Sequence, residues 1–564
     1  MPATLTYPGV YIQEIPSGVH AITGVATSVT AFVGRAASGP DSQAITINSY
    51  GDFERIFGGL WPSSSLGYTV RDFFLNGGGQ AVIVRLFNPD TGNANSKVKV
   101  GTFTFAAASK GAWGGNLRAS IDTNVSPDVA RRYGLAPTDL FNLTIQLLDA
   151  SGAAVRTEVF RNLSVKDSPA RVDKTLAAQS TLLQWDGSWP PNPLPTIPPP
   201  PQNPPPGAPT FATLTDDVSK AHAQLAAAQA ANPQVPADIA AAQNALSTAL
   251  AAVAGSDGRA LTANDSFLPN GAQANKRGLY ALEGADFNLL CIPPYTASSD
   301  VDAALVSAAA SYCEARRAFL LIDPPSAWAD KATAKNQFLG TPDPIGTRSA
   351  NAAIFFPRLL QPDPLKNNQV ATFVPCGAVA GVFARTDASR GVWKAPAGIQ
   401  AGFANVPDLS VKLTDDENGE LNPLGINCLR AFPAAGQVVW GARTLRGADQ
   451  LADQYKYIPV RRTALFLESS LLRGLQWAVF EPNDEPLWSA IRLNVGAFMQ
   501  TLFRQGAFQG ATPREAYFVK CDSETTTQAD INLGVVNVIV GFAPLKPAEF
   551  VVISIQQLAG QVAA

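Results

Sequence analysis

An alternating apolar segment stands alone near the N-terminus. The sequence YPGVYIQEI begins beside Pro8 and is followed by Pro16, so both of its ends carry residues that interrupt regular structure. Side chains in a strand alternate between two faces. We therefore predict a short strand, detached from the rest of the chain, with Val10, Ile12 and Glu14 on one face and Tyr11, Gln13 and Ile15 on the other.

A second segment of this kind lies near the C-terminus, after the connector APLKPAE. Three of its side chains fall on each face: Val551, Ile553 and Ile555 alternate with Phe550, Val552 and Ser554. A lone strand cannot pair its backbone N–H and C=O groups by itself, so a sheet must receive it. That sheet belongs either to the same chain or to a neighbouring copy, and the proline-containing connectors at both ends favour a reach outward.

The ranges 21–100 and 276–440 have the pattern of an α/β core. Strand-like runs such as AFVGRA, AITI and AVIVRLF alternate with helical patterns in SYGDFERIFGG and LGYTVRDFFLNGG. After Gly278 the apolar runs DFNLLCIPP, AFLLIDPP and NAAIFFPRL each meet proline, which is typical of buried strands that end in turns. We expect one mixed sheet built from both ranges.

The range 101–275 is predicted to be an insertion at the surface. It holds the proline-rich tract PPNPLPTIPPPPQNPPPGAP, which suits neither a helix nor a central strand. Two alanine-rich helices over 215–231 and 236–254 follow, broken at Asn232 and Pro233. Their narrow apolar stripe predicts a small helical hairpin attached to a larger body.

The range 441–545 predicts a second α/β domain, and 546–564 a C-terminal arm to match the N-terminal arm over 1–20. Helices are expected over 464–479 and 487–504, followed by strands in EAYFVKC and GVVNVIVGF. The second helix has a clear apolar stripe, made of Trp488, Ile491, Val495, Phe498 and Leu502. Its opposite face carries Arg492 and Arg504. The fold class is therefore α/β (α+β), in several domains.

Composition changes this picture in one respect. The chain has 564 residues, of which only 15% are charged, and a formal net charge of -3. A large chain with few charges indicates a surface covered by other copies or partners, although an alanine- and glycine-rich domain is an equal alternative.

The near-neutral charge without a lysine or arginine block predicts no nucleic-acid partner. Since no segment approaches 18 apolar residues, we also expect no membrane-spanning or Sec-exported segment.

Candidate chemistry is sparse. The two histidines, His20 and His222, cannot supply a multi-histidine metal site or a histidine triad, and both are expected at the surface. No phosphate-binding loop occurs. Five scattered cysteines, at 291, 313, 376, 428 and 521, suit buried reduced thiols. We expect no metal and no cofactor.

Two acidic motifs have both a functional and a structural interpretation. TDDENGE at 414–420 resembles a calcium loop, but aligning Gly419 to the invariant glycine puts Gly425 where a glutamate is required, so we interpret it as a polar turn. Asp323 follows the buried run AFLLI, and a hydrolase that pairs it with a second carboxylate such as Asp343 or Asp363 is conceivable. We favour a turn in which Asp323 accepts backbone hydrogen bonds.

Several long blocks resemble contractile tail sheath proteins. They are YPGVYIQEIPSGVHAITGVATSVTAFVGRAASGP, FERIFGGLWPSSSLGYTVRDFFLNGGGQAVIVRL, GVFARTDASRGVWKAPAG, INCLRAFPAAGQVVWGARTL, YIPVRRTALFLESSLLRGLQWAVFEPNDEPLW and NVIVGFAPLKPAEFVVISIQQ. They occur in order and cover the first hundred residues and most of 278–560, whereas 101–275 carries no part of this resemblance.

The resemblance implies a structural subunit and no catalytic residue. Copies would stack as hexameric rings in a helical sheath around an inner tube, and contraction would drive the tube through a target cell envelope. Arms such as Val10–Ile15 and Phe550–Ile555 would add strands to the C-terminal-domain sheet of neighbouring subunits. A helix of that domain touches the tube in this family, and we assign this contact to Arg492 and Arg504.

The resemblance also implies baseplate and terminal cap proteins as partners and assembly in the bacterial cytoplasm, in a phage tail or a tail-like particle that can be released. Direct membrane insertion is not expected. Two alternatives remain: a tail-associated hydrolase with paired carboxylates, and a static coat polymer that does not contract.

Overall fold

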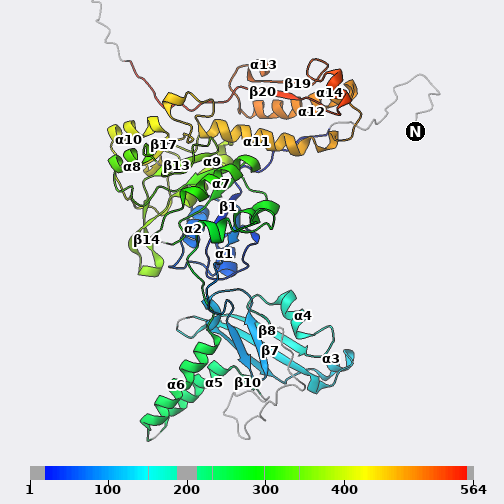
Figure 1. The fold of residues 1–564 in the computed structure, drawn as a ribbon, viewed down its shortest axis with the longest axis vertical. Helices are drawn as coiled ribbons and strands as arrows, with labels where there is room; N and C mark the ends of the chain where they lie inside the picture. The colour runs from blue at the N-terminus through cyan, green and yellow to red at the C-terminus, as the bar shows by residue number, and fades with distance from the viewer. Residues whose placement is uncertain are drawn as a thin grey trace, which may run out of the picture.

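The computed structural model describes residues 20–149, 151–186, 213–231, 233–296, 299–341 and 343–554. They form three bodies along one long axis (Figure 1). The core lies in the middle, the insertion hangs below it on a narrow neck, and the C-terminal region lies across the opposite end. The predicted arm residues Val10–Ile15 and Ile555 lie outside the described residues.

The core is built on one eight-stranded mixed sheet, as the sequence predicted. Its strands are β1 (Thr30–Gly34), β2 (Ala44–Ile47), β3 (Ala81–Arg85), β11 (Leu289–Cys291), β12 (Phe319–Ile322), β13 (Ala352–Phe356), β17 (Ile426–Phe432) and β18 (Gly436–Val439). They lie in the order β18-β17-β13-β12-β11-β1-β3-β2. Strands β17 to β3 in this order run parallel, and the two outer strands are antiparallel to their neighbours.

Both faces of this sheet are covered, which explains why its strands are continuous apolar runs. One face packs against α1 (Tyr50–Phe57), α2 (Leu66–Leu75) and α9 (Cys376–Arg390) through Phe53, Phe73 and Phe383. The other face packs against α7 (Ala303–Arg316) and α8 (Lys331–Phe338). A small sheet of β14 (Leu359–Asp363), β15 (Gln369–Phe373) and β16 (Asp408–Leu409) flanks the core.

The insertion has a hydrophobic core of its own, centred on Phe103, Phe105 and Phe141. One sheet contains β4 (Lys97–Val100), β5 (Phe103–Ala107) and β9 (Leu183–Trp185). The other contains β6 (Leu117–Asp122), β7 (Leu140–Leu148), β8 (Ala154–Ser164) and β10 (Thr213–Thr215). Two short helices, α3 (Pro127–Arg132) and α4 (Val172–Gln179), complete this body.

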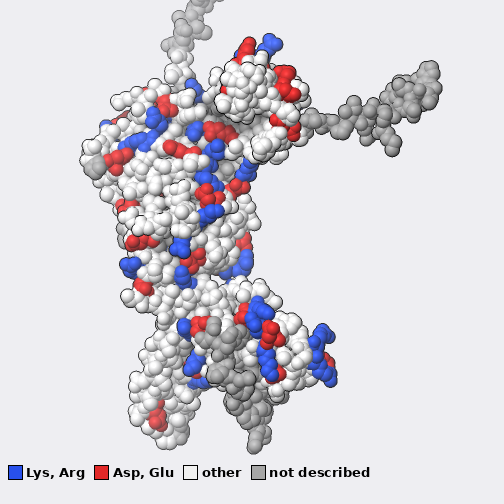
Figure 2. All heavy atoms as spheres, turned by 45° about the vertical axis from the view of Figure 1, so that its right-hand side comes forward, with Lys and Arg blue, Asp and Glu red and all other residues white. Residues whose placement is uncertain are grey.

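The predicted helical hairpin is present as α5 (Asp217–Ala230) and α6 (Pro236–Val253). It projects away from the insertion (Figure 1), and its surface is almost free of charge (Figure 2). Elsewhere on the face shown in Figure 2, charged side chains form scattered groups between broad uncharged areas.

The C-terminal region contains α11 (Ile458–Gly474), α12 (Glu485–Arg504), α13 (Pro513–Ala516), β19 (Tyr517–Lys520), α14 (Gln528–Asn532) and β20 (Ile539–Phe542). The stripe predicted for α12 is confirmed, because all five of its apolar side chains are buried. The predicted helix over 464–479 has wrong bounds. The observed helix begins at Ile458, because Pro459 lies in the first turn, where the N–H that proline lacks would have no partner within the helix. It ends at Gly474.

The prediction of a polar turn at 414–420 is also wrong. Thr414 is the N-cap of helix α10 (Asp415–Leu421), and its hydroxyl accepts from the backbone N–H of Glu417. The carboxylate of Glu417 accepts from the backbone N–H of Thr414 in return. This reciprocal capping box starts a helix where acidic composition alone indicated a turn.

Candidate intersubunit surface

The described part of the C-terminal arm is an apolar segment without a strand partner among the described residues. Phe550–Ser554 is assigned to no strand, and its side chains point to solvent: Val551 is 81% and Val552 87% exposed. Side chains of this size are normally covered in a folded protein. A contiguous exposed apolar run of this kind marks a candidate interaction surface.

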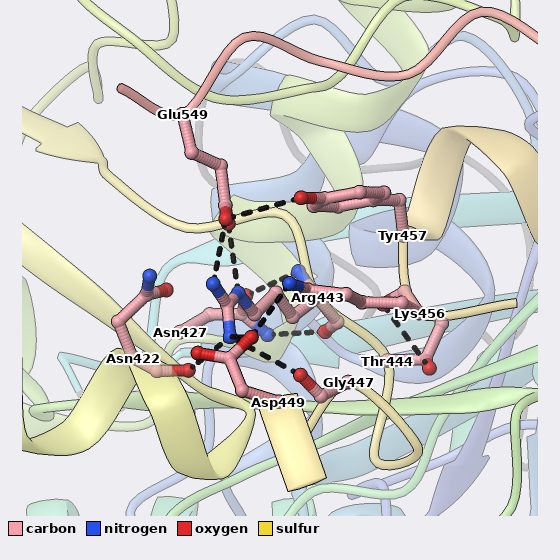
Figure 3. A network of polar contacts seen from close by, with 9 residues as sticks. All are labelled: Asn422, Asn427, Arg443, Thr444, Gly447, Asp449, Lys456, Tyr457 and Glu549. Carbon is pink, nitrogen blue, oxygen red and sulfur yellow. Dashed lines mark hydrogen bonds and ion pairs between the residues drawn. The ribbon is translucent and has the colours of Figure 1, made fainter. Parts of the chain in front are cut away.

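The arm leaves the molecule at a buried polar network (Figure 3). The Nε and Nη2 atoms of Arg443 donate to the two carboxylate oxygens of Glu549, at 2.8 and 2.6 Å. The hydroxyl of Tyr457 donates to the same carboxylate, at 3.2 Å. Glu549 directly precedes Phe550, so this network fixes the root of the arm.

Arg443 is almost fully buried, and every nitrogen of its guanidinium has a partner. Its Nη1 donates to the backbone oxygens of Asn422 and Gly447 and, at 2.9 Å, to Asp449. Burial is the largest single influence on the pKa of Arg443 and lowers it, but the hydrogen bonds to Glu549 and the negative charges of Glu549 and Asp449 together raise it overall. A bidentate arginine–carboxylate pair of this kind is among the stronger polar contacts in proteins.

The two-stranded sheet β19–β20 precedes the arm root in the chain and belongs to the C-terminal region. Its strands pair antiparallel with each other, from Tyr517 opposite Phe542 to Lys520 opposite Ile539. Phe518 and Ile539 are about half exposed. Each strand has one edge without a strand partner among the described residues, so the sheet can accept further strands.

The two arginines assigned to tube contact differ in their surroundings. Arg492 forms an ion pair with Glu485 at 2.5 Å and donates to the backbone oxygen of Cys521, and the hydrogen bond to Glu485 raises its pKa. Arg504 is exposed in the last turn of α12. Only the second of these side chains points freely into solvent.

The site proposed for a hydrolase does not have the required form. Asp323 is half-buried with its Oδ2 atom fully enclosed, and its Oδ1 accepts from the backbone N–H of Cys376 at 2.8 Å, at the start of α9. Burial raises its pKa to about 6. The cavity beside it measures about 30 Å³, roughly the volume of one water molecule.

The partner carboxylates considered for Asp323 make local contacts of their own. Asp343 forms an ion pair with Arg348 at 3.2 Å, and Asp363 accepts from the hydroxyl of Tyr68 at 2.9 Å. Neither lines the cavity at Asp323, where Asp300 and Arg358 do. The interpretation of Asp323 as a backbone hydrogen-bond acceptor is confirmed, although its partner comes from a distant helix and not from a local turn.

The remaining reactive side chains also have structural surroundings. All five cysteines are buried free thiols, as predicted. His20 is exposed and stacks on Trp477, with 4.3 Å between the ring centroids, and His222 is exposed on α5. Among the described residues, no group of histidine, cysteine and acidic side chains has the arrangement of a metal site. No helix within the described ranges combines the length and apolarity needed to cross a bilayer.

Sequence reasoning missed the pair Arg443–Glu549. Both residues lie within blocks that resemble sheath proteins, VVWGARTL and APLKPAEF, but they are 106 positions apart. One signal in the sequence could have indicated this pair. Glu549 is a single carboxylate directly before an alternating apolar segment, a position that suits a residue with a fixed partner.

Known proteins resemble the chain over its second half in sequence and over most of its length in fold. The family model of the phage tail sheath protein central domain matches residues 269–445, and that of the phage tail sheath C-terminal domain matches residues 451–557. The tail sheath protein of Vibrio phage KVP40 is 31% identical over 139 residues, and that of Enterobacteria phage T4 is 28% identical over 169 residues. These alignments span 24% and 30% of this chain, but only 20% and 24% of the respective relatives.

Solved structures share the fold. The chain aligns over 98% of its length with the anti-feeding prophage helical sheath in its contracted state, at 22% identity and a TM-score of 0.52, and covers 100% of that chain. A sheath complex of an extracellular contractile injection system, PVC, aligns over 98% of both chains, at 20% identity and 0.52. A sheath tail protein from Listeria innocua aligns over 93% of this chain and 97% of its own, at 13% identity and 0.54.

The two family models together cover about half of the sequence, and their order along the chain matches the order of the central and C-terminal bodies. The chain belongs to the phage tail sheath family.

Proposed function

We propose that this chain is the structural subunit of a contractile sheath. Its copies stack as hexameric rings in a helical polymer around an inner tube, and contraction of the polymer drives the tube through a target cell envelope. The observation that carries this proposal is the exposed apolar arm Phe550–Ser554 in a chain of the sheath family. The subunit acts by assembly and not as an enzyme.

Strand addition between copies accounts for the exposed arm. A paired strand gains several backbone hydrogen bonds, each with a net value of about 1 kcal/mol. Full burial of a large apolar side chain adds about 1.5–3 kcal/mol. Contacts of this strength hold neighbouring subunits together while weaker surfaces slide past each other.

We propose the sheet β19–β20 as the receiving surface. An isolated two-stranded sheet is marginally stable in water, and strands from neighbouring copies would extend it. Phe518 and Ile539 are already half exposed on this sheet, so added strands can cover them. The segment Val10–Ile15 would supply a second arm.

The inner tube, the baseplate and a terminal cap complete the proposed set of partners. Arg504 at the end of α12 is the better candidate for contact with an acidic tube surface, because Arg492 is engaged with Glu485. The particle would assemble in the bacterial cytoplasm and function in a phage tail or a released tail-like particle.

Substitution within the arm tests the proposal. Val551→Asp places a charge in the added strand, and we expect at least a tenfold rise in the subunit concentration needed for polymerisation, measured by sedimentation and electron microscopy. The monomer should melt as the wild type does, because Val551 is exposed. Deletion of 1–15 should likewise leave a folded monomer that does not polymerise.

The matched control is Val370→Asp, at an exposed valine on the edge strand β15, far from the arm in the sequence. It should polymerise as the wild type does. Normal long sheaths from both Val551→Asp and the 1–15 deletion would contradict the proposal. A polymer that has one diameter under all conditions would instead favour the static coat.

A further inference from the structure

The two ends of the described chain are attached to opposite ends of helix α11 (Figure 1). At the N-terminal end of α11, the cap residue Tyr457 contacts Glu549, the root of the C-terminal arm. Arg443 is placed beside it, because it forms an antiparallel bridge with Tyr457. Both partners of Glu549 therefore lie at the N-terminal end of α11.

The other end of α11 holds the first described residues. His20 stacks on Trp477, which lies in the short helical turn that follows α11. From there the chain runs back along the helix. The backbone N–H of Val25 donates to the hydroxyl of Ser470 at 3.2 Å, and the guanidinium of Arg462 donates to the backbone oxygen of Thr27 at 2.8 Å.

The fit along α11 is close. A Cβ atom on Gly474 would lie 2.6 Å from the Cγ2 atom of Ile22, and one on Gly24 would lie 2.9 Å from the ring of Phe466. Arg462 is itself fixed by a buried bidentate pair with Asp387, at 2.6 and 2.9 Å. The segment from His20 to Thr27 is thus bound along most of the helix.

Helix α11 is a stiff spacer between these attachment points. It contains 17 residues, which corresponds to about 25 Å. Ile458 and Leu465 are buried against the core sheet, and Leu467 is buried in the C-terminal region, so α11 also joins these two bodies.

We propose that α11 sets a fixed distance between the positions at which the two arms leave the subunit. Arg443, Tyr457 and Glu549 form the clamp at one end of α11. His20 and Trp477 form the clamp at the other end. This inference rests on the proposed function, since it gives the arms a role in linking copies. A displacement of one arm is then transmitted to the other through one helix, while the eight-stranded sheet carries no strain.

Release of Glu549 would lengthen the free part of the C-terminal arm. The last attachment before it is at Ala543 and Pro544, which contact Gln509 and Phe508. Residues 545–548 lie along an open cleft of about 980 Å³. Without the clamp these residues become part of the arm, and ordering them on assembly costs conformational entropy.

The first test uses Glu549→Gln, which keeps the shape of the side chain and removes its charge. We expect at least a tenfold rise in the subunit concentration left unassembled, and a smaller rise for Tyr457→Phe, which keeps the ion pair with Arg443. The control Asp128→Asn alters an exposed ion pair with Arg131 on helix α3 of the insertion, away from both arms and from β19–β20, and should have no effect. Melting of each monomer by circular dichroism shows that it is folded.

The second test measures the spacing itself. Ala548→Cys and Gln476→Cys place spin labels near the two ends of α11 at exposed positions, and the five native cysteines are buried and stay unlabelled. Pulsed electron resonance should give one narrow distance distribution, with the same mean in the monomer and in extended and contracted sheaths that contain few labelled copies. Glu549→Gln should broaden this distribution even if its assembly is unchanged.

The outcomes separate the two proposals. If the wild type and the Asp128→Asn control polymerise and Glu549→Gln assembles equally well with a narrow distance distribution, the clamp is wrong and the sheath function stands. A mean distance that differs between extended and contracted sheaths also contradicts the fixed spacing. If the wild type forms no helical polymer, the proposed function fails and this inference fails with it.

Discussion

Buried charges in this protein are stabilised in two different ways. Arg443 and Arg462 form bidentate pairs with Glu549 and Asp387, which come from distant parts of the chain. Asp323 lacks a cationic hydrogen-bond partner among the described residues, and burial raises its pKa to about 6. One oxygen of Asp323 accepts from a backbone N–H, whereas the other has no partner in the described structure. Burial therefore favours the protonated form of Asp323 more than water does, up to about pH 6.

This raised pKa predicts the direction of a pH effect on stability. An unfolded aspartate titrates near pH 4, so between about pH 4 and 6 the folded protein binds a proton that the unfolded chain has lost. The contribution of Asp323 to the free energy of unfolding should therefore fall by about 2–3 kcal/mol as pH rises through this window, and stay constant above it. Asp323→Asn should remove most of this loss, as measured by urea unfolding at a series of pH values.

The control for this prediction is Asp416→Asn, at an exposed position on α10. It should keep the wild-type dependence on pH. Asp72, which is also buried with its pKa raised to about 6, contributes a second slope of the same sign that both variants retain. An Asp323→Asn protein whose stability depends on pH as the wild type does would contradict the assignment.

At the scale of elements, most of the core and C-terminal region could be predicted, because their patterns are local. Strands buried on both faces are apolar runs that end in proline, and α12 has both an apolar stripe and the N-cap Asp484. The strands of the insertion were missed, although Leu117, Ala119 and Ile121 alternate cleanly in β6. The long proline tract in the same range, which suits no regular element, masked this period-two pattern.

The contacts that fix the arm roots could not be predicted in the same way. Arg443 and Glu549 meet only because β17, α11 and the C-terminal segment converge, and no local pattern encodes that convergence. The close contact between Ile22 and Gly474 could not be predicted from a local pattern either. What the sequence does contain is the arm itself, since its alternation is visible without a fold.

Helix α11 offers an element-scale prediction. Gly474→Ala should push Ile22 away from the helix, because the new methyl group would lie 2.6 Å from it. We expect faster proteolysis near His20–Val25 and a loss of about 1–3 kcal/mol in unfolding free energy.

Gly496→Ala in the middle of α12 is the matched control, because its Cβ would meet nothing within 4 Å. There the change should be neutral or stabilise the protein by up to about 1 kcal/mol. Equal effects of the two substitutions would show that close packing of Ile22 on α11 is unimportant.

At the scale of the whole molecule, the insertion is an independent body on a narrow connection (Figure 1), with its own hydrophobic core. The helical hairpin contributes little to that core, since among its described residues only Val218, Ala221 and Val253, near its base, are buried. Deletion of residues 187–260 would remove contacts to the rest of the protein as well as the proline-rich tract and the projecting hairpin. Asp216 accepts from the backbone N–H of Ala119, and the backbone oxygen of Asp257 accepts from Arg35.

A shorter deletion is therefore the better test of whether the hairpin is needed. Replacing 224–250 with a short glycine linker removes the projecting part and keeps both contacts. We expect melting within a few degrees of the wild type and sheaths of normal length by electron microscopy. Loss of sheaths from a folded protein would instead assign the hairpin a role in assembly.

The central claim is that the arms of one subunit complete the sheet of another. The most direct measurement is a cryo-electron microscopy map of the assembled polymer at a resolution that traces Phe550–Ile553. We expect this segment to be paired as a strand with β19 or β20 of a neighbouring copy, while Glu549 stays on Arg443 of its own subunit. A map in which the segment folds back onto its own chain, with no strand crossing between copies, would contradict it.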